Sequence, residues 1–325
     1  MKAIVHTAYG PADELRLKEV RKPVPKDNEV LIKIIATTVT TTDCNVRNFT
    51  FVPKLFLLPA RLIFGMRKPR INILGIDLAG EIEAAGKNVT RFKVGDRVFG
   101  TQGTVFGCHA EYTCVPEHGV LAKKPDNLSF EEAASVFLAG STALYYIRDL
   151  AEVRAGQKIL IIGASGAIGT YSVQLAKYYG TEVTGVCSGA NAALVRSLGA
   201  DKVIDYTDED HARKFETYDV VFDVVGKTSF ARSRHLLKKG GMYLVNLITG
   251  SDLLHMLFPF LRKGRKIKGG SAPERAEDLN YLKKLLEEGR IKPVIDGVYP
   301  LEKTAEAFKY VESGHKKGTV VITIP

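Results

Sequence analysis

The chain has 325 residues, 45% of them hydrophobic and 25% charged, an ordinary globular composition for about two domains. No apolar run approaches the ~20 residues needed to span a bilayer, and the N-terminal segment lacks the pattern of a signal peptide, so we expect a cytosolic protein. The net charge of +10 comes from Lys and Arg residues dispersed along the chain, which disfavours a dedicated nucleic-acid-binding protein.

The first 120 or so residues contain segments in which apolar and polar side chains alternate. EVLIKIIATTV (29–39) and LAGEIEAAG (78–86) show this pattern, which predicts mainly antiparallel β-structure. Between them, residues 51–70 (FVPKLFLLPARLIFGMRKPR) are unusually apolar and basic, and their prolines interrupt any long helix. This segment is a candidate hydrophobic wall or lid over a lipophilic substrate, a membrane-surface contact, or an interdomain packing element; the sequence leaves all three open.

From Lys158 onward, apolar runs alternate with helical periodicity, the order typical of a parallel sheet. The expected strands are KILIIG, TEVTGVCS, KVIDY, YDVVFDVVG and MYLVNLI, and the expected helices between them include TYSVQLAKYYG, NAALVRSLG and SFARSRHLLKKGG. Near-continuous Val, Ile and Leu runs indicate strands covered on both faces, so we predict an α/β fold with a doubly wound parallel sheet. The C-terminal stretch predicts small β elements around one helix, so a split domain would enclose this one.

A glycine-rich turn follows the first of these strands. Its residues are Gly163, Ala164, Ser165, Gly166, Ala167, Ile168 and Gly169. Small residues here let the chain turn sharply, approach a pyrophosphate with bare backbone, and pack the next helix against the sheet. Backbone N–H groups and the helix dipole would then face the phosphates. Because the turn lies within a βαβ unit, we predict a dinucleotide site rather than a plain strand-to-helix turn.

The end of the second strand of this unit indicates which dinucleotide binds. An Asp or Glu about 20 residues beyond the fingerprint would accept hydrogen bonds from the 2′-hydroxyl of NAD. This chain has Cys187, Ser188 and Gly189 there. With no carboxylate to repel a 2′-phosphate, and with Ser188, Lys177 and Tyr206 as donors, we predict NADPH rather than NADH. The alternative is that these are ordinary surface residues.

Distinctive longer segments are spread over nearly the whole chain. They are LGIDLAGEIEAAGKNVTRFKVGDRVFG (74–100), AEYTCVP, LAGSTALYY, GASGAIGTYSVQLAKYYG and RSLGADKVIDY. Together they resemble the medium-chain dehydrogenase/reductase superfamily, particularly its zinc-independent quinone and enone reductase branch. The resemblance implies a GroES-like, mainly antiparallel β catalytic domain over residues 1–123 and 286–325, and a Rossmann NADPH-binding domain over residues 124–285. It also implies a nicotinamide in the interdomain cleft.

Zinc-dependent members of the superfamily hold a catalytic zinc with Cys, His and Cys. Aligned on their motifs, these ligand positions fall on Thr40, Ile76 and Leu138, none of which is a Cys or His. The four cysteines form no CxxC pair, and the run CHAEYTC (108–114) lacks a fourth ligand at suitable spacing. We therefore expect no bound zinc.

Without a Lewis acid, an enzyme cannot readily acidify an alcohol, whereas conjugate reduction of a quinone or an α,β-unsaturated carbonyl depends less on Lewis-acid activation. Hydride transfer then produces a delocalised anion that hydrogen-bond donors can stabilise. In the resembled family, an Asn, an Asp three residues on and an Arg four after that line the cleft. This chain has Thr40, Asp43 and Arg47 there. Thr40 departs from the pattern, and Asp43 with Arg47 could instead be a structural ion pair.

The resemblance also implies which residues surround the nicotinamide. Thr142 is expected near the ring, unless its hydroxyl bonds only to its own helix backbone. Gly226, Leu247 and Ser271 lie on segments that usually line the same pocket. Similar proteins often dimerise, so we expect a homodimer in which the strands around MYLVNLI and RKIKGGS pair across a two-fold axis.

The predicted function is therefore the NADPH-dependent reduction of a quinone or of the activated C=C bond of an α,β-unsaturated carbonyl compound. A zinc-free carbonyl or aldehyde reductase is one alternative, and a basic nucleic-acid-binding protein that retains a nucleotide fold is another. A hydrolase with Ser165 as nucleophile is a poor third, because the elbow motif requires glycine at position 167, which is Ala167.

Overall fold

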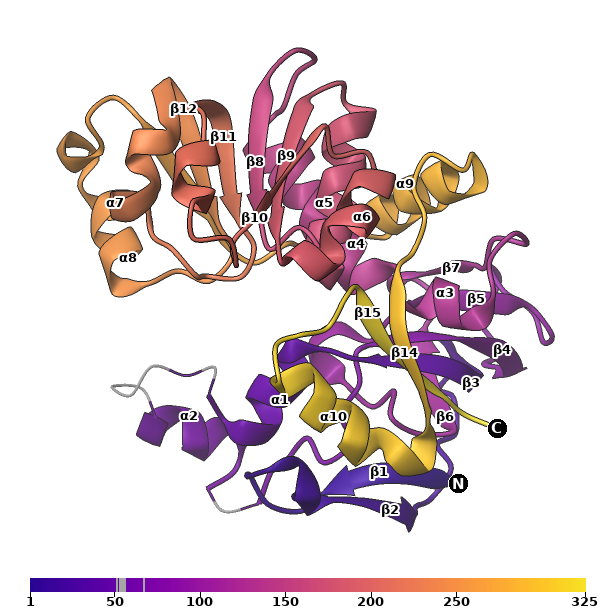
Figure 1. The fold of residues 1–325 in the computed structure, drawn as a ribbon. Coiled ribbons are helices and arrows are strands. Elements are labelled where there is room, and N and C mark those ends of the chain that lie inside the picture. Colours follow the sequence, from indigo (N-terminus) through magenta and orange to yellow (C-terminus); the bar gives the residue numbers. More distant parts are fainter. Residues whose placement is uncertain (51, 53–56, 67) are drawn as a thin grey trace. The chain divides into compact units, whose positions relative to one another are not determined.

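Figure 1 shows the fold as a computed structural model, which describes residues 1–50, 52, 57–66 and 68–325. The chain divides into two compact units. The first unit contains Met1–Leu138, Glu274–Glu287 and Pro293–Pro325, and the second contains Ala139–Pro273 and Glu288–Lys292. Both ends of the chain therefore belong to the first unit, as the split-domain prediction requires.

The first unit is built on a mixed sheet. Its strands are β3 (Glu29–Val39), β4 (Asp77–Ala85), β5 (Arg97–Thr101), β6 (Tyr112–Pro116), β7 (Leu121–Lys123), β14 (Ile295–Pro300) and β15 (Thr319–Thr323). They follow the order β14-β15-β3-β4-β5-β7, with β6 also paired to β3, and β1 (Lys2–His6) pairs with β2 (Leu15–Glu19) separately. Neighbours run antiparallel except β14 and β15, which are parallel. The antiparallel segments predicted at residues 29–39 and 78–86 are confirmed as β3 and β4.

Helices of the first unit cover this sheet and its loops. They are α1 (Thr41–Asn48), α2 (Leu57–Phe64), α3 (Phe130–Ala134), α9 (Ala276–Glu287) and α10 (Thr304–Glu312), with short turns η1 (Ala12–Glu14), η3 (Gly103–Val105) and η9 (Leu301–Lys303). The core between sheet and helices contains Ile32, Ile34 and Phe308, all fully buried. Alternating strand residues and one apolar helix face therefore meet in one core.

The division between the units differs from the predicted borders after residues 123 and 285. Helix α3 packs on β3, β4 and β5, and α9 packs on β7, so both belong to the first unit. The Asn127 side chain joins these segments by donating a 3.0 Å hydrogen bond to the carbonyl of Leu286. Tertiary packing, rather than the position of the first Rossmann strand, decides where the border falls.

Part of segment 51–70 lies outside the described residues. Within it, α2 is short and carries Pro59 in its first turn, where the missing N–H costs no intrahelical hydrogen bond. Leu58 and Leu62 on this helix are exposed, while the Tyr9 hydroxyl holds its end by donating a 2.8 Å hydrogen bond to the carbonyl of Phe64. The three roles expected of this segment stay predictions. None of the described helices has the length and apolar character needed to cross a bilayer.

The second unit is a parallel sheet with helical connections, which confirms the doubly wound prediction. Its strands are β8 (Lys158–Ile162), β9 (Glu182–Cys187), β10 (Lys202–Asp205), β11 (Tyr218–Asp223), β12 (Leu237–Val245) and β13 (Lys266–Gly269). The order is β10-β9-β8-β11-β12-β13, with every pair parallel. Ile159, Leu160 and Ile161 in β8 are all fully buried, as expected for a strand covered on both faces.

The connections of the second unit are short helices and turns. They are α5 (Ala167–Tyr178), η5 (Gly189–Asn191), α6 (Ala192–Ser197), η6 (His211–Lys214), α7 (Phe230–Ser233), η7 (Arg234–Leu236), α8 (Gly250–Leu257) and η8 (Pro259–Arg262). The chain enters this unit through α4 (Phe137–Leu144) and η4 (Tyr145–Leu150).

Two expectations for the second unit are corrected. The helix predicted over residues 229–241 ends at Leu236, because Leu237 is buried beside Tyr218 in the sheet and Gly240 has a positive φ of 78°. The expected pairing of two strands with a second copy cannot involve β12, since β11 and β13 occupy both of its edges. Of the two strands expected to pair with a second copy, only β13 is at an edge of the described sheet, and the homodimer stays a prediction.

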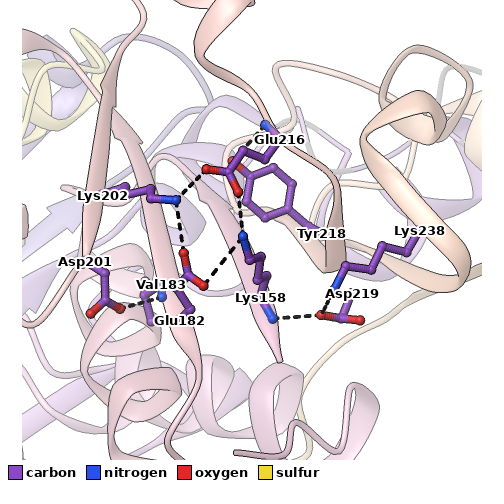
Figure 2. Close-up of polar contacts among 9 residues, drawn as sticks. All are labelled: Lys158, Glu182, Val183, Asp201, Lys202, Glu216, Tyr218, Asp219 and Lys238. Atoms are coloured by element: carbon purple, nitrogen blue, oxygen red, sulfur yellow. Dashed lines mark hydrogen bonds and ion pairs between the residues drawn. The ribbon is translucent and has the colours of Figure 1, made fainter. Parts of the chain in front are cut away.

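A network of charged side chains joins the starts of three strands at the amino edge of this sheet (Figure 2). The Lys158 ammonium lies 2.6 Å from Glu216 and 3.7 Å from Glu182. Lys202 lies 3.1 Å from Glu182 and also contacts Glu216. Hydrogen bonds from Lys158 and Lys202 lower the pKa of Glu216 to about 2. The network therefore links β8, β9, β10 and the entry to β11 as long as Glu216 is ionised.

We expect Glu216→Gln to lower the thermal unfolding midpoint at neutral pH, and the difference to disappear as the pH falls towards 2. Because the folded pKa of Glu216 is about 2 and its ordinary value is 4.5, its contribution is complete above pH 4.5 and is lost as the pH falls through the folded pKa. These side chains are solvent-exposed, so the effect is small and shrinks in high salt.

Thermal unfolding followed at a series of pH values measures this difference. Glu209→Gln is the matched control, because Glu209 is exposed in the same unit and forms no ion pair in the described structure. Equal losses in the two variants across the pH series would show that the network does not stabilise the sheet.

Candidate cofactor and active site

The glycine turn lies at the point where the strand order of the second unit reverses. From β8 the chain proceeds outward through β9 and β10, then returns to the other side of β8 with β11. Ligands of doubly wound sheets bind at the carboxyl ends of the strands at such a switch point. The turn at Gly163–Gly169 follows the carboxyl end of β8, so the topology places it there.

The backbone of the turn is shaped for an anion. Gly163 has a positive φ of 86°, and the N–H groups of Gly163 and Ala164 donate to the carbonyl of Val186 at 3.1 and 3.0 Å. Helix α5 begins at Ala167, and no side chain of the described residues caps it at Gly166. The N–H groups of its first turn therefore lack an intrahelical or side-chain acceptor, which suits a phosphate.

Two glycines of the turn have different structural tasks. A Cβ added to Gly169 would stand 2.1 Å from the carbonyl oxygen of Gly163, so only glycine lets α5 approach β8 this closely. A Cβ on Gly166 would meet its nearest atom, the same oxygen, at 3.5 Å, an ordinary contact. Gly169 is thus required by the fold, whereas the space beside Gly166 is open to a ligand.

Further predicted residues lie at the same edge of the sheet. Gly226, Leu247 and Ser271 follow β11, β12 and β13, and because these strands are parallel to β8 their carboxyl ends share its edge. A Cβ on Gly226 would stand 3.0 Å from the Cβ of Leu247, which places these two side by side. The structure therefore brings this predicted group to the edge that carries the glycine turn.

Asp223 shapes the loop that carries Gly226, and sequence reasoning missed it. This fully buried carboxylate accepts hydrogen bonds from the N–H groups of Val225 at 3.1 Å, Gly226 at 2.8 Å and Thr228 at 2.9 Å. It holds the loop after β11 in one conformation, since a buried carboxylate is costly unless it is hydrogen-bonded. The sequence signal that could have identified Asp223 is an acidic residue at the end of an otherwise apolar run, VVFD.

Thr142 lies buried in α4, a few residues before a stretch of π-helix. The chain continues directly into η4, a π-helical stretch of a kind frequently found at functional sites. In η4 the Tyr146 hydroxyl lies 2.9 Å from the carbonyl of Val245 and 2.7 Å from that of Gly270. Tyr146 thereby ties the helix to the carboxyl ends of β12 and β13, and Thr142 precedes it by about one helical turn.

Ser188 and Tyr206 follow the adjacent strands β9 and β10. Cys187 and Asp205, which end these strands, are register partners, and the N–H of Tyr206 donates a 3.1 Å hydrogen bond to the carbonyl of Cys187. Tyr206 is exposed and Ser188 is partly exposed. The structure therefore places both predicted 2′-phosphate ligands at the carboxyl edge beside the glycine turn.

The premise that no carboxylate lies at this position is wrong. The Asp205 carboxylate accepts hydrogen bonds from the hydroxyl and N–H of Thr207 at 2.7 and 2.9 Å, and one oxygen lies 2.3 Å from where a Cβ on Gly189 would be. These bonds to Thr207 lower the pKa of Asp205. The acid reaches the site from the neighbouring strand, so the search along β9 alone did not find it.

The prediction for Lys177 is also wrong. Helix α5 runs from the turn towards the amino edge of the sheet, which puts Lys177 in its last turn ~15 Å from the start of the helix. Its ammonium lies 2.5 Å from Asp201, and Asp201 accepts a 2.8 Å hydrogen bond from the N–H of Val183 near the start of β9. Lys177 therefore lies at the amino edge of the sheet, whereas Ser188 lies at the carboxyl edge.

Ser165 in the glycine turn has a structural partner. Its hydroxyl accepts a 3.1 Å hydrogen bond from the buried side chain of Asn191, which follows β9. A serine nucleophile would instead need a histidine or another base within reach. This contact gives no support to the hydrolase alternative and explains Ser165 as a link between two loops of the cofactor edge.

In the first unit, Thr40 and Asp43 form the capping box of α1. The Thr40 N–H and hydroxyl donate to Asp43 at 2.9 and 2.5 Å, and the Asp43 N–H donates to the Thr40 hydroxyl oxygen at 3.2 Å. The other carboxylate oxygen of Asp43 accepts a 2.9 Å hydrogen bond from the N–H of Gly75. Asp43 is fully buried with both oxygens engaged, which supports a structural role, and the catalytic role predicted for it stays a prediction.

Arg47 is fully buried and forms an ion pair with Glu312 of α10, not with Asp43. Its guanidinium lies 5.0 Å from the ring centre of Phe308, on the same helix as Glu312. The capping box turns Asp43 back towards Thr40, whereas Arg47, one turn later on α1, reaches α10. The alternative that Arg47 forms a structural ion pair is thus correct, but its partner is Glu312 rather than Asp43. Arg47 joins two helices of the first unit.

Ile76 and Leu138, two of the positions aligned with zinc ligands, are linked here by a buried carboxyl group. Asp77, next to Ile76, accepts a 3.1 Å hydrogen bond from the N–H of Leu138, and burial raises its pKa to about 8. Cys108 donates to the carbonyl of Ile76 at 3.3 Å, and burial raises its pKa, which keeps the thiol protonated. No group of three potential ligands that could hold a metal occurs among the described residues.

Two protein families match the chain. Residues 26–126 match the alcohol dehydrogenase GroES-like domain, and residues 198–322 match a family described as zinc-binding dehydrogenase. The second description applies to that family as a whole, because Thr40, Ile76 and Leu138 of this chain supply no zinc ligand.

Individual proteins match over almost the full length. The chain is 35% identical to 2-methylene-furan-3-one reductase of Solanum lycopersicum over 99% of the chain and 79% of that protein. It is 34% identical to the chloroplastic NADPH-dependent alkenal/one oxidoreductase of Arabidopsis thaliana, with the same coverage. The solved structure of quinone oxidoreductase from Coxiella burnetii superposes with a TM-score of 0.88 at 30% identity, covering 100% of this chain and 99% of that one.

Substitution of the two glycines by alanine separates folding from cofactor binding. We expect Gly169→Ala to lower the thermal unfolding midpoint, since its Cβ would overlap the Gly163 carbonyl at 2.1 Å. We expect Gly166→Ala to leave that midpoint unchanged but to weaken nicotinamide dinucleotide binding at least tenfold, since the methyl group occupies space that a pyrophosphate needs. Thermal unfolding and fluorescence titration measure the two effects.

Gly156→Ala is a control for the loss of a glycine in the same unit, because a Cβ there meets no atom within 4 Å, although its positive φ of 81° adds some strain. Unchanged cofactor affinity in Gly166→Ala would show that the turn is a plain strand-to-helix connection.

Proposed function

Because the chain belongs to the quinone and enone reductase branch of the medium-chain dehydrogenase/reductase superfamily, we propose that it transfers a hydride from NADPH to a quinone or to the activated C=C bond of an α,β-unsaturated carbonyl compound. The observation that carries this proposal is the glycine turn at the switch point, where an uncapped helix start and the space beside Gly166 suit a pyrophosphate.

The names of the relatives support this acceptor class. One acts on a 2-methylene-furan-3-one, one on alkenals and enones, and one on quinones. In each acceptor, hydride addition places the new electron pair in a system conjugated with a carbonyl oxygen. The resulting enolate or hydroquinone anion is stabilised by hydrogen-bond donors and then takes a proton, so no metal is required.

A bound nicotinamide would supply the hydride, and residues of the second unit would position it. Gly226, Leu247 and Ser271 share the edge of the glycine turn, and Thr142 lies on the helix that Tyr146 ties to the same edge. We assign to Thr142 a hydrogen bond that orients the nicotinamide or the reacting carbonyl. The structural partners of Thr40, Asp43 and Arg47 in α1 leave them outside this assignment.

NADPH is the proposed form of the cofactor. The hydroxyl groups of Ser188 and of the exposed Tyr206 are donors at the ends of β9 and β10, where a 2′-phosphate would lie, and one relative is named for its use of NADPH. Asp205 opposes this preference with a negative charge at the same place. We therefore propose NADPH as the preferred cofactor, with Asp205 limiting the size of the preference.

Product analysis tests the proposed reaction. With NADPH, we expect oxidation of the cofactor by quinones and by medium-chain alkenals and enones, conversion of enones to saturated carbonyl compounds, and no reduction of saturated aldehydes. A metal chelator should leave the rate unchanged. We expect Thr142→Val to reduce kcat/KM about fivefold, the usual cost of one lost hydrogen bond. Reduction of saturated aldehydes to alcohols instead would favour the zinc-free carbonyl reductase.

Asp205→Asn tests the cofactor assignment separately. The amide keeps an oxygen that can accept the Thr207 N–H but removes the negative charge, so we expect NADPH affinity to rise about fivefold relative to NADH affinity. Competitive titration of both cofactors against the two proteins measures this ratio. A ratio that does not change would mean that the 2′-phosphate does not lie beside Gly189.

A further inference from the structure

The hydroxyl group of Tyr146 lies at the point where two strands of the second unit end. Its oxygen lies 2.9 Å from the carbonyl oxygen of Val245 and 2.7 Å from that of Gly270, and the N–H of Gly270 donates to it at 3.1 Å. Val245 is the last residue of β12, and Gly270 directly follows Gly269, its register partner at the end of β13. One side chain thus closes the carboxyl end of this strand pair.

The Tyr146 ring is held in place as well as its hydroxyl group. Tyr146 is fully buried, and its ring stacks on that of Phe222 in β11, with 4.6 Å between the ring centres and 15° between the planes. Burial raises the pKa of Tyr146 to about 12, so the side chain is neutral at ordinary assay pH. Its hydrogen is engaged by backbone carbonyls, which suits an anchor for the backbone better than an acid that releases a proton.

The helical stretch that carries Tyr146 is attached to β13 at a second point. In η4 the N–H of Ala151 donates to the carbonyl of Tyr146 at 3.0 Å, five residues back, which is the wide turn of a π-helix. At the end of η4, the Lys268 ammonium donates a 2.8 Å hydrogen bond to the carbonyl of Leu150. These two attachments fix η4 along the end of β13, and Thr142 in α4 lies about one helical turn before the first of them.

The side chains that come directly after the anchored carbonyls are exposed. Leu247 is 52% exposed and lies two residues after Val245, and the exposed Ser271 lies one residue after Gly270. Leu247 and Ser271 are both among the residues expected to surround the nicotinamide. Because a chain reaches less than ~4 Å per residue, a hydroxyl group that fixes the two carbonyls also limits where these side chains can lie.

We propose that Tyr146 is a positioning residue for the nicotinamide, whose hydroxyl group fixes the spacing between the helix of Thr142 and the loops that follow β12 and β13. This role rests on the proposed function, in which the C4–H bond of the nicotinamide breaks, a C–H bond to the acceptor forms, and the reduced acceptor takes a proton from solvent. Such a transfer depends steeply on the distance and angle between donor and acceptor carbons, so a small loop displacement slows it strongly. Tyr146 acts through the backbone that it holds and not on the reacting atoms.

A tyrosine that only stabilises the core would behave differently. Loss of its hydroxyl group would lower the thermal unfolding midpoint, but the folded protein would transfer hydride at an unchanged rate. Tyr218 offers this comparison in the same sheet, because it is buried and its hydroxyl oxygen accepts a 3.4 Å hydrogen bond from the N–H of Glu216 at the amino edge.

Tyr146→Phe removes the hydroxyl group and keeps the stacked ring, and Tyr218→Phe is its matched control. We expect Tyr146→Phe to reduce kcat about tenfold and NADPH affinity about threefold, with no change in affinity for 2′-phospho-ADP-ribose, which is the cofactor without its nicotinamide. The primary isotope effect with C4-deuterated NADPH should grow, because hydride transfer becomes the slow step. Tyr218→Phe should change none of these quantities.

Hydrogen exchange in the cofactor-free protein tests the anchor without turnover. Exchange at the N–H of Gly270 and in segments 244–248 and 268–272 should be faster in Tyr146→Phe but not in Tyr218→Phe, since the acceptor of the Gly270 N–H is lost. A variant with 4-aminophenylalanine at position 146 restores a donor at the end of the ring and should recover part of the protection and of kcat. It replaces Tyr146→Phe in these measurements if the latter is unfolded at the assay temperature.

Three results would overturn the role of Tyr146. These are an unchanged kcat and isotope effect in folded Tyr146→Phe, equal weakening of NADPH and 2′-phospho-ADP-ribose, and the same losses in Tyr218→Phe. Failure of the proposed reaction would look different. The unchanged chain would then reduce neither quinones nor enones, whereas Tyr146→Phe would still show faster exchange at Gly270 and a loss of affinity confined to NADPH.

Discussion

The start of α5 lies so close to the end of β8 that no side chain fits between them. A Cβ at Gly169 would come within 2.1 Å of the Gly163 carbonyl oxygen, so the helix and strand can meet only because that atom is missing. This approach brings the uncapped N–H groups of the helix to the switch point of the sheet. The loops after β11, β12 and β13 share that edge, and the cofactor assignment depends on this shared position.

Buried carboxyl groups set the loops around this framework. Asp43 holds Gly75, Asp77 holds Leu138 and Asp223 holds Gly226, each by accepting a backbone hydrogen bond. Burying such a group is costly unless it is paired, so each one favours a single loop conformation. In the first unit these bonds surround the positions that carry zinc ligands in related enzymes. Hydrogen bonds there organise the backbone.

Parallel strands also separate two kinds of surface in the second unit. Every loop that follows a strand lies at the carboxyl edge, and every loop that leads into the next strand lies at the amino edge. The first edge carries the glycine turn, Ser188 and Tyr206. The second carries the charged network of Glu216. The glycine turn and the charged network therefore lie at opposite edges of one sheet.

The sequence by itself predicted antiparallel strands in the first unit, alternating strands and helices in the second, and the place of the nucleotide turn, because apolar periodicity and glycine requirements are local properties. It also excluded zinc ligation at Thr40, Ile76 and Leu138, since residue type alone decides that. Only the tertiary structure decided which distant residues meet. Asp205 reaches Gly189 from a neighbouring strand, Arg47 pairs with Glu312 far along the chain, and Lys177 faces the opposite edge. Such contacts depend on strand register and helix direction in three dimensions, which spacing along the chain does not encode.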